Sequence, residues 1–418
     1  MPASGNPTPL LAAQAACAGF AVAVLYALSN TTFIIANGAE NLPYAYLWAC
    51  VLSPPLSFAY NRLQRRWPVS RLNIITVVAF TLLHLIAWGF SRSSYVDIAA
   101  YVLFIGYTLA LAFLVIVVTT QANRLFNSDQ MKTQYPTILA VQTVALIACG
   151  LIIAPLSRWL GGETQTLLAG AGVMLIMLLT VGLTTHYFPQ LSRLPAPHKL
   201  QPLKIEKLLQ QRVPRLILIY QFLSSVGTLL VMYLVPLMAQ RVFNSSEELT
   251  QFFGHLIAAA TLGALLFLVF GASKILLKKG VGFGLIMNPV GVIGIIVVML
   301  ITSVWFPEQL VLLLILAAVA RALDFILAVG ATETSVNTFI KQLPDNTQLP
   351  LINAINALAF PLSYGAAALI ILSMQLWSSS SLPVFLSITL MLCVCWTISA
   401  FLLAGDANNA DLALKAAS

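Results

Sequence analysis

Long apolar stretches alternate with short polar ones along almost the whole chain. The apolar stretches are about twenty residues long, the length that a helix needs to cross the roughly 30 Å hydrocarbon core of a membrane. Backbone groups in lipid must be paired within their own segment, so such stretches form helices. The pattern predicts an all-α membrane protein with about twelve spans. They are expected at 10–36, 44–60, 73–91, 97–120, 137–156, 166–188, 214–238, 252–276, 281–304, 308–331, 349–375 and 382–404.

The composition agrees with this class. Only 8% of the residues are charged and 60% are hydrophobic, whereas about a quarter of the residues of a soluble domain are charged. Twelve spans leave almost none of the 418 residues for a soluble domain. The five cysteines all fall inside apolar stretches without metal-site spacing, so we expect them to be small core residues.

The basic residues predict the orientation. With a cytoplasmic N-terminus, the inner loops and C-terminus hold seventeen of the 21 Lys and Arg residues. The outer loops hold three, and Arg321 lies inside a span. Because positive charge collects on the cytoplasmic side, both termini are expected there, in a multi-pass protein of a bacterial inner membrane. The net charge of +8 therefore reflects topology and contact with lipid. We expect no nucleic-acid partner.

The longest polar stretch lies near the middle of the chain, with six spans before it and six after it. This predicts an N-terminal six-helix bundle at 1–188, a cytoplasmic linker at 189–213 and a C-terminal six-helix bundle at 214–418. Within the linker, LKIEKLLQQ can form a short amphipathic helix. Two such bundles resemble the major facilitator transporters, whose halves are built from inverted three-helix repeats.

Two segments carry a narrower resemblance. The first is NTTFIIANGAENLPYAYLWACVLSPPLSFAYNRLQRR from Asn30 to Arg66, and the second is RALDFILAVGATETSVNTFIKQLPDNTQLPLINAIN from Arg321 to Asn356. Both resemble the ATP/ADP translocase-type nucleotide transporters of plastids and intracellular bacteria. The resemblance implies a transporter with the same fold. The matching residues of the first segment are Gly38, Ala39, Glu40, Leu42, Pro43, Leu47 and Trp48.

The chain departs from that family in its charges. The nucleotide carriers place several Lys, Arg and Glu residues inside their spans to hold phosphates. Here eight of the twelve predicted spans have no Lys, Arg, Asp or Glu in their central portions. The resemblance therefore extends to the fold and the transporter class, and a nucleotide exchange carrier is the alternative function.

Arg321 and Asp324 are the clearest candidates for chemistry. They lie near the middle of a predicted span, where a charge costs several kcal/mol. Three residues apart on a helix, they share a face and can pair. The pair can be a structural link to a neighbouring helix. It can also serve transport, because the resemblance to the major facilitator fold implies that the tenth span lines the central cavity. In that case Arg321 holds an anionic group, and Asp324 is its counter-ion or a proton carrier.

Spans one, four and seven line the same cavity in that fold and carry polar residues. In span seven, four of them follow the i, i+3, i+4, i+7 spacing and form one polar stripe on a helix. Small polar residues also hold membrane helices together, so a structural role remains open for each. The further candidates for substrate binding or coupling are Gln221, Ser224, Ser225 and Thr228 in the stripe, Tyr26, Asn30 and Tyr107 in spans one and four, and Asn353 and Asn356 at the start of span eleven.

Three further positions, Pro289, Pro361 and Glu333, are candidates for gating. Asn353 and Asn356 begin span eleven, and Pro361 is expected to break its middle; Pro289 is expected to break span nine. Broken helices near the membrane midplane often mark transport sites or moving gates. Glu333, near the cytoplasmic end of span ten, is either part of a gating ion pair or an interfacial carboxylate.

Together these features predict a secondary active transporter that works as a monomer by alternating access. Its substrate is expected to be a small organic solute with limited net charge, such as an amphipathic metabolite, a siderophore, a drug or a nucleoside-like compound. A proton or another ion is the expected coupling partner. The sequence has no Walker motif or hydrolase triad, so neither an enzyme nor a cofactor is expected. A membrane receptor or scaffold is the remaining alternative.

Overall fold

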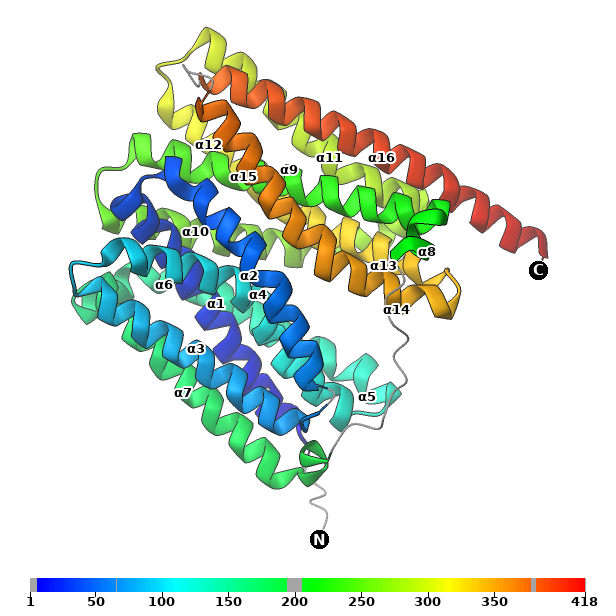
Figure 1. The fold of residues 1–418 in the computed structure, drawn as a ribbon, viewed down its shortest axis with the longest axis horizontal. Coiled ribbons are helices and arrows are strands. Elements are labelled where there is room, and N and C mark those ends of the chain that lie inside the picture. The colour runs from blue at the N-terminus through cyan, green and yellow to red at the C-terminus, as the bar shows by residue number, and fades with distance from the viewer. Residues whose placement is uncertain (1–5, 65, 194–204, 377–380, 418) are drawn as a thin grey trace. The chain divides into compact units, whose positions relative to one another are not determined.

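The described part of the chain is helical and contains no β-strand. The computed structural model describes residues 6–64, 66–193, 205–376 and 381–417 (Figure 1). The α-helices are α1 (Thr8–Asn37), α2 (Leu42–Gln64), α3 (Val69–Ser91), α4 (Val96–Leu125), α5 (Ser128–Thr133), α6 (Tyr135–Leu160), α7 (Glu163–Tyr187), α8 (Ile205–Gln210), α9 (Arg212–Val242), α10 (Ser246–Phe267), α11 (Ser273–Trp305), α12 (Leu310–Leu327), α13 (Glu333–Lys341), α14 (Asp345–Ala354), α15 (Phe360–Leu376) and α16 (Leu382–Ala417).

The prediction of an all-α membrane protein is confirmed. Within the described residues, 10 helical segments are long and apolar enough to cross a membrane. Helix α15 is apolar but shorter, and α2, which contains Pro54 and Pro55, is not among the 10. The count of twelve spans therefore stays a prediction. Of the expected linker 189–213, residues 194–204 lie outside the described part of the chain.

The chain divides into two compact units. Unit 1 comprises Met1–Gly38, Pro55–Leu200 and Phe243–Ala259. Helix α1 lies at its centre and contacts α4, α6 and α7, while α3 runs beside α7 and also contacts α4 (Figure 1). In the most apolar part of α1, 72% of the residues are buried. Unit 1 is therefore built around its first helix.

Unit 2 comprises Ala39–Pro54, Gln201–Val242 and Ala260–Ser418. Helix α9 contacts α12, α15 and α16, and α11 contacts α12 and α16. In the most apolar part of α9, 67% of the residues are buried. The same fraction is 28–44% in the candidate spans other than α1 and α9. The first helix of each predicted half is thus the one most enclosed by its neighbours.

Two helices contribute segments to both units. The first part of α2 belongs to unit 2, where the ring of Tyr46 packs edge-on against Tyr364 of α15 at 5.8 Å. The first part of α10 belongs to unit 1, where Gly254 lies against the backbone of Gly150 in α6. The glycines allow close contact, since a Cβ on Gly254 would lie 2.5 Å from the Gly150 carbonyl oxygen.

Three π-helical turns interrupt the helices of unit 2. They are η3 (Leu268–Ala272), η4 (Ala328–Thr332) and η5 (Ile355–Ala359). The turn η4 packs against the end of α10, because Gly330 leaves room for the ring of Phe267. Such turns are rare and are often found at functional sites. They change the direction of side chains along three of the predicted spans.

The expected break at Pro289 does not occur. Helix α11 continues through Pro289, and its one non-helical residue is Gly280, with φ 83° and ψ 169°. A proline removes one hydrogen bond, which neighbouring helices can compensate inside a membrane protein. Glycine is suited to the turn at 280 because it adopts positive φ without strain. In span eleven the interruption is η5, and α15 continues through Pro361.

Candidate functional site

A buried ion pair lies inside unit 2, on one face of α12. Asp324 follows Arg321 at position i+3, and the Arg321 guanidinium Nη1 donates to Asp324 Oδ2 at 2.9 Å. Asp324 is fully buried, and Arg321 is 9% exposed. The remainder of α12 is almost entirely apolar, so this pair carries the helix's two charges. The expected pairing of the two residues is present.

Asp324 also binds the two helices next to α12. Its Oδ1 accepts a hydrogen bond from the Thr228 hydroxyl of α9 at 3.0 Å. The same oxygen accepts from the Asn288 amide nitrogen of α11 at 3.2 Å. With Arg321, three donors from three helices therefore surround one carboxylate. All three suit an ionised carboxylate, which only accepts hydrogen bonds.

The guanidinium of Arg321 has an aromatic neighbour as well. Its Cζ lies 5.7 Å from the centre of the Phe325 ring. This position allows a cation–π attraction, which gains strength where water is excluded. Arg321 is consequently held by two consecutive residues one turn further along α12, the Asp324 carboxylate and the Phe325 ring.

Several polar atoms of unit 2 are buried without a hydrogen-bond partner among the described residues. Asn288 donates to Asp324, but its amide oxygen has no partner. The same is true of the Thr332 hydroxyl in η4 and the Trp396 indole nitrogen in α16. Trp396 packs against Tyr220, whose hydroxyl donates to the Leu285 carbonyl at 3.0 Å. Buried polar groups are normally satisfied, so unpartnered ones often mark places where water or a ligand binds.

The polar stripe of span seven lies on α9. Thr228 reaches Asp324, Ser224 is buried, and Gln221 and Ser225 are half-buried. A binding role for the stripe stays a prediction. The contact with Asp324 involves only the last member of the stripe.

The candidates in spans one and four lie in unit 1. The rings of Tyr26 and Tyr107 pack edge-on at 5.2 Å, and Tyr26 also contacts Phe253 of α10 at 6.1 Å. The side chain of Asn30 donates to the Tyr26 carbonyl at 2.8 Å. Tyr26, Tyr107 and Phe253 thus form a buried aromatic cluster joining α1, α4 and α10. Their role in binding stays a prediction.

The remaining candidates lie near the π-helical turns. Asn353 is half-buried at the end of α14, Asn356 is exposed in η5, and Pro361 is buried just after η5. Glu333 begins α13 directly after η4, is exposed, and forms no ion pair with another described residue. A gating role for Glu333 stays a prediction.

Other buried polar groups were not among the sequence candidates. Asn288 directly precedes Pro289, and an amide within an apolar stretch is the sequence signal for its buried contact. In unit 1, Gln14 donates to Thr184 at 2.9 Å and accepts from Gln121 at 2.6 Å. These three side chains are fully buried and join α1, α4 and α7. Glutamines inside predicted spans were the corresponding signal.

Comparison with solved structures relates this arrangement to known transporters. The nucleoside transporter NupG aligns with a TM-score of 0.67, 12% identity, and coverage of 96% of this chain and 99% of that one. A POT family transporter in complex with 5-aminolevulinic acid aligns with a TM-score of 0.68 and 10% identity, covering 98% of this chain and 99% of that one. A bacterial homologue of the iron transporter ferroportin, in an inward-facing state, aligns with a TM-score of 0.66 and 11% identity, covering 95% of this chain and 98% of that one. The fold is that of the major facilitator transporters.

The major facilitator fold is shown by structure and not by sequence similarity. No protein-family model matches the chain, and no curated protein matches it in sequence. Identities of 10–12% establish the shared fold alone. Among the described residues, no group of three or more His, Cys, Asp or Glu side chains is arranged to hold a metal ion.

Proposed function

We propose that this major facilitator protein is a secondary active transporter of a small organic solute. It has twelve spans in two six-helix halves, 1–188 and 214–418, joined by a cytoplasmic linker at 189–213. The halves alternate between access from either side of the membrane. The chain acts as a monomer, without enzymatic activity, cofactor or resident metal.

The observation that carries the proposal is the surroundings of Asp324. A fully buried carboxylate in an apolar helix is costly, so such residues usually mark ion or substrate pathways. A purely structural pair would need only Arg321. Here the carboxylate also binds α9 and α11, and the amide of Asn288 keeps an unpartnered oxygen beside it. Protonating Asp324 or giving it a bound cationic group would loosen contacts to three helices together.

The scarcity of charge favours a solute of limited net charge. The solved structures with this fold include a nucleoside transporter and a transporter in complex with 5-aminolevulinic acid. Nucleosides and 5-aminolevulinic acid are both small polar solutes. We infer that Arg321 holds an anionic or strongly accepting group of the solute, while Thr228 and Asn288 adjust to it. Transport is energised by a proton or ion gradient, with Asp324 as the coupling group.

A flux assay tests the proposal. The purified protein is first screened by thermal shift with nucleosides, ATP, ADP, 5-aminolevulinic acid, siderophores and cationic drugs, because a bound substrate stabilises the folded state. Compounds that raise the melting temperature are then offered to proteoliposomes containing only this protein. We expect uptake that an imposed pH or ion gradient drives above equilibrium. Exchange of ATP for ADP without a gradient would instead identify a nucleotide exchange carrier, and stabilisation without any flux would identify a receptor.

The proposed topology gives a separate prediction. With both termini cytoplasmic, single cysteines at Gln190 or Gln134 should resist a membrane-impermeant maleimide in intact cells and react after permeabilisation. A cysteine at Ser94 should react in intact cells. These positions lie in short segments between the long helices. Labelling of Gln190→Cys from outside would contradict the orientation.

A further inference from the structure

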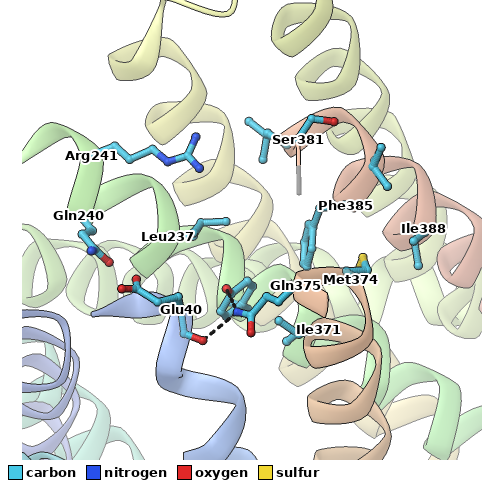
Figure 2. Close-up of a pocket in the computed structure, with 13 residues that line it drawn as sticks. Glu40, Leu237, Gln240, Arg241, Ile371, Met374, Gln375, Ser381, Phe385 and Ile388 are labelled. Carbon is cyan, nitrogen blue, oxygen red and sulfur yellow. Dashed lines mark hydrogen bonds between the residues drawn. The ribbon is translucent and has the colours of Figure 1, made fainter. Parts of the chain in front are cut away.

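Unit 2 contains a pocket that shares no residue with the Asp324 cluster. Its volume is 640 Å³, and it lies where α9 and α15 end and α16 begins (Figure 2). Thr228 and Arg241 are both on α9 and thirteen residues apart, which is about 20 Å along the helix axis. The pocket is therefore at the end of the helices, away from the buried ion pair.

One side of the pocket carries charge. Glu40 comes from η1 (Ala39–Asn41) and Arg241 from the last turn of α9, and both are exposed. Neither side chain forms an ion pair with a described residue. A carboxylate and a guanidinium thus line the same pocket and remain available to a ligand. Figure 2 shows both on one side of the pocket, together with Gln240.

Hydrogen bonds fix the backbone that presents Glu40. The Gln375 amide nitrogen of α15 donates to the Glu40 carbonyl at 2.8 Å and contacts the Tyr233 hydroxyl at 3.4 Å. The Ala39 backbone nitrogen donates to the Gln240 side chain at 2.6 Å. The turn η1 is therefore tied to both α9 and α15. The backbone that carries Glu40 is therefore fixed relative to the last turn of α9, which lowers the entropic cost of binding.

The opposite side of the pocket is apolar. Ile371 and Met374 of α15 and Phe385 and Ile388 of α16 line it, facing the charged side across the pocket (Figure 2). The ring of Phe385 packs against Tyr233 at 5.5 Å. Ligand pockets commonly have such a mostly apolar lining with a few placed polar groups and volumes of about 300–1,000 Å³.

We propose that this pocket binds a zwitterionic amphiphile. Its anionic group binds the guanidinium of Arg241, its primary ammonium group binds the carboxylate of Glu40, and its apolar part lies against Met374, Phe385 and Ile388. Charge-assisted hydrogen bonds to both ends select a ligand that carries both charges. Such a ligand is either a soluble apolar zwitterion or a phospholipid with an ethanolamine headgroup, since both present the same groups. The site is separate from the transport site and requires no transport.

Two matched pairs of probes test the site on the full-length purified protein. The lipid pair is lysophosphatidylethanolamine and lysophosphatidylcholine with the same acyl chain, measured by native mass spectrometry. The soluble pair is phenylalanine and N-acetylphenylalanine, measured by calorimetry. In each pair only the first member has a primary ammonium group that can donate to Glu40. We expect one of the first members to bind at least about tenfold more tightly than its partner, as the loss of a charge-assisted hydrogen bond implies.

Variants locate the binding. Glu40→Gln should abolish the preference within the pair, and Arg241→Gln should weaken binding of the preferred probe about tenfold. Phe385→Ala should weaken both members of the pair. Arg158→Gln changes an exposed arginine of unit 1 and should leave binding unchanged. Because Glu40 and Arg241 are exposed, their variants should keep the melting temperature of the wild type.

The outcomes separate this site from the proposed transport function. Preference for the ethanolamine lipid identifies a lipid site, and preference for phenylalanine identifies a site for a soluble zwitterion. The proposal is overturned if neither lysophosphatidylethanolamine nor phenylalanine binds more tightly than its partner. It is also overturned if Glu40→Gln and Arg241→Gln leave the preference unchanged. Asp324→Asn should leave this binding intact, so loss of transport alone does not affect the result.

Discussion

Asp324→Asn should abolish concentrative uptake of the solute identified by the flux assay. The substitution keeps the size of the side chain but removes the charge that pairs with Arg321 at 2.9 Å. It also leaves Arg321 buried without its counter-ion, which costs about 3–5 kcal/mol in measured cases. Reduced thermal stability of the single variant is therefore expected for either role of the pair. Stability alone does not separate a structural pair from a mechanistic one.

The double variant Arg321→Gln/Asp324→Asn separates the two roles. It removes both charges, so the melting temperature should recover toward that of the wild type. If Asp324 couples transport to an ion or balances the bound solute, the stable double variant should still fail to concentrate the solute. Uptake and the melting temperature are measured on the same purified preparations.

The exposed ion pair between Arg158 and Glu247 supplies the control. The double variant Arg158→Gln/Glu247→Gln removes the same two charges from a pair whose side chains are 58% and 52% exposed. Exposed pairs contribute about 0–1 kcal/mol, so both stability and uptake should stay near wild type. Full concentrative uptake by a stable Arg321→Gln/Asp324→Asn variant would remove both residues from the mechanism. The stripe on α9 would then be the next candidate.

The pairing of Arg321 with Asp324 could be predicted because it is local. Their spacing depends only on helix geometry, and the cost of charge in an apolar segment singles them out. The contacts from Thr228 and Asn288 depend on how α9 and α11 are rotated within unit 2. The spacing of the stripe places all four side chains on one face of α9. It therefore could not distinguish Thr228 from Gln221, Ser224 or Ser225.

The positions of the helix interruptions were less predictable. Proline was expected to break span nine, but α11 continues through Pro289 and turns at Gly280. The π-helical turns at 268–272, 328–332 and 355–359 each add one residue to a helical turn. Their segments read LVFGA, AVGAT and INALA, which differ little from ordinary helical sequence in a membrane. Tertiary packing, such as Phe267 against Gly330, determines where they form.

The pocket lined by Glu40 and Arg241 could not be predicted from any local pattern. Glu40, Arg241 and Gln375 are far apart in the sequence and meet only because the ends of α9 and α15 lie beside η1. Glu40 was noticed within the segment that resembles nucleotide carriers, where its neighbour Gly38 ends α1 with φ 77°. The resemblance singles out Glu40, and the fold brings it beside the ends of α9 and α15.

The tightest helix contact of unit 1 gives the second large expected effect. A Cβ on Gly19 of α1 would lie 2.2 Å from the backbone carbonyl oxygen of Gln142 and 3.1 Å from the Leu146 nitrogen, both in α6. Backbone atoms cannot move aside by changing a side-chain rotamer. Gly19→Ala therefore forces α1 and α6 apart by about 1 Å, and such overpacking costs about 1–3 kcal/mol or more. Because α1 is the most buried helix of unit 1, the strain reaches all its neighbours.

Gly172→Ala in α7 is the matched control for this contact. A Cβ at Gly172 meets no atom within 4 Å, so alanine fits without a shift. Alanine is also the better helix former, by about 1 kcal/mol in soluble hosts. We expect Gly172→Ala to keep or raise the melting temperature in detergent, and Gly19→Ala to lower it together with the yield of folded protein. Equal melting temperatures for the two variants would mean that α1 and α6 are not held together at Gly19. The packing of unit 1 around α1 would then need a different explanation.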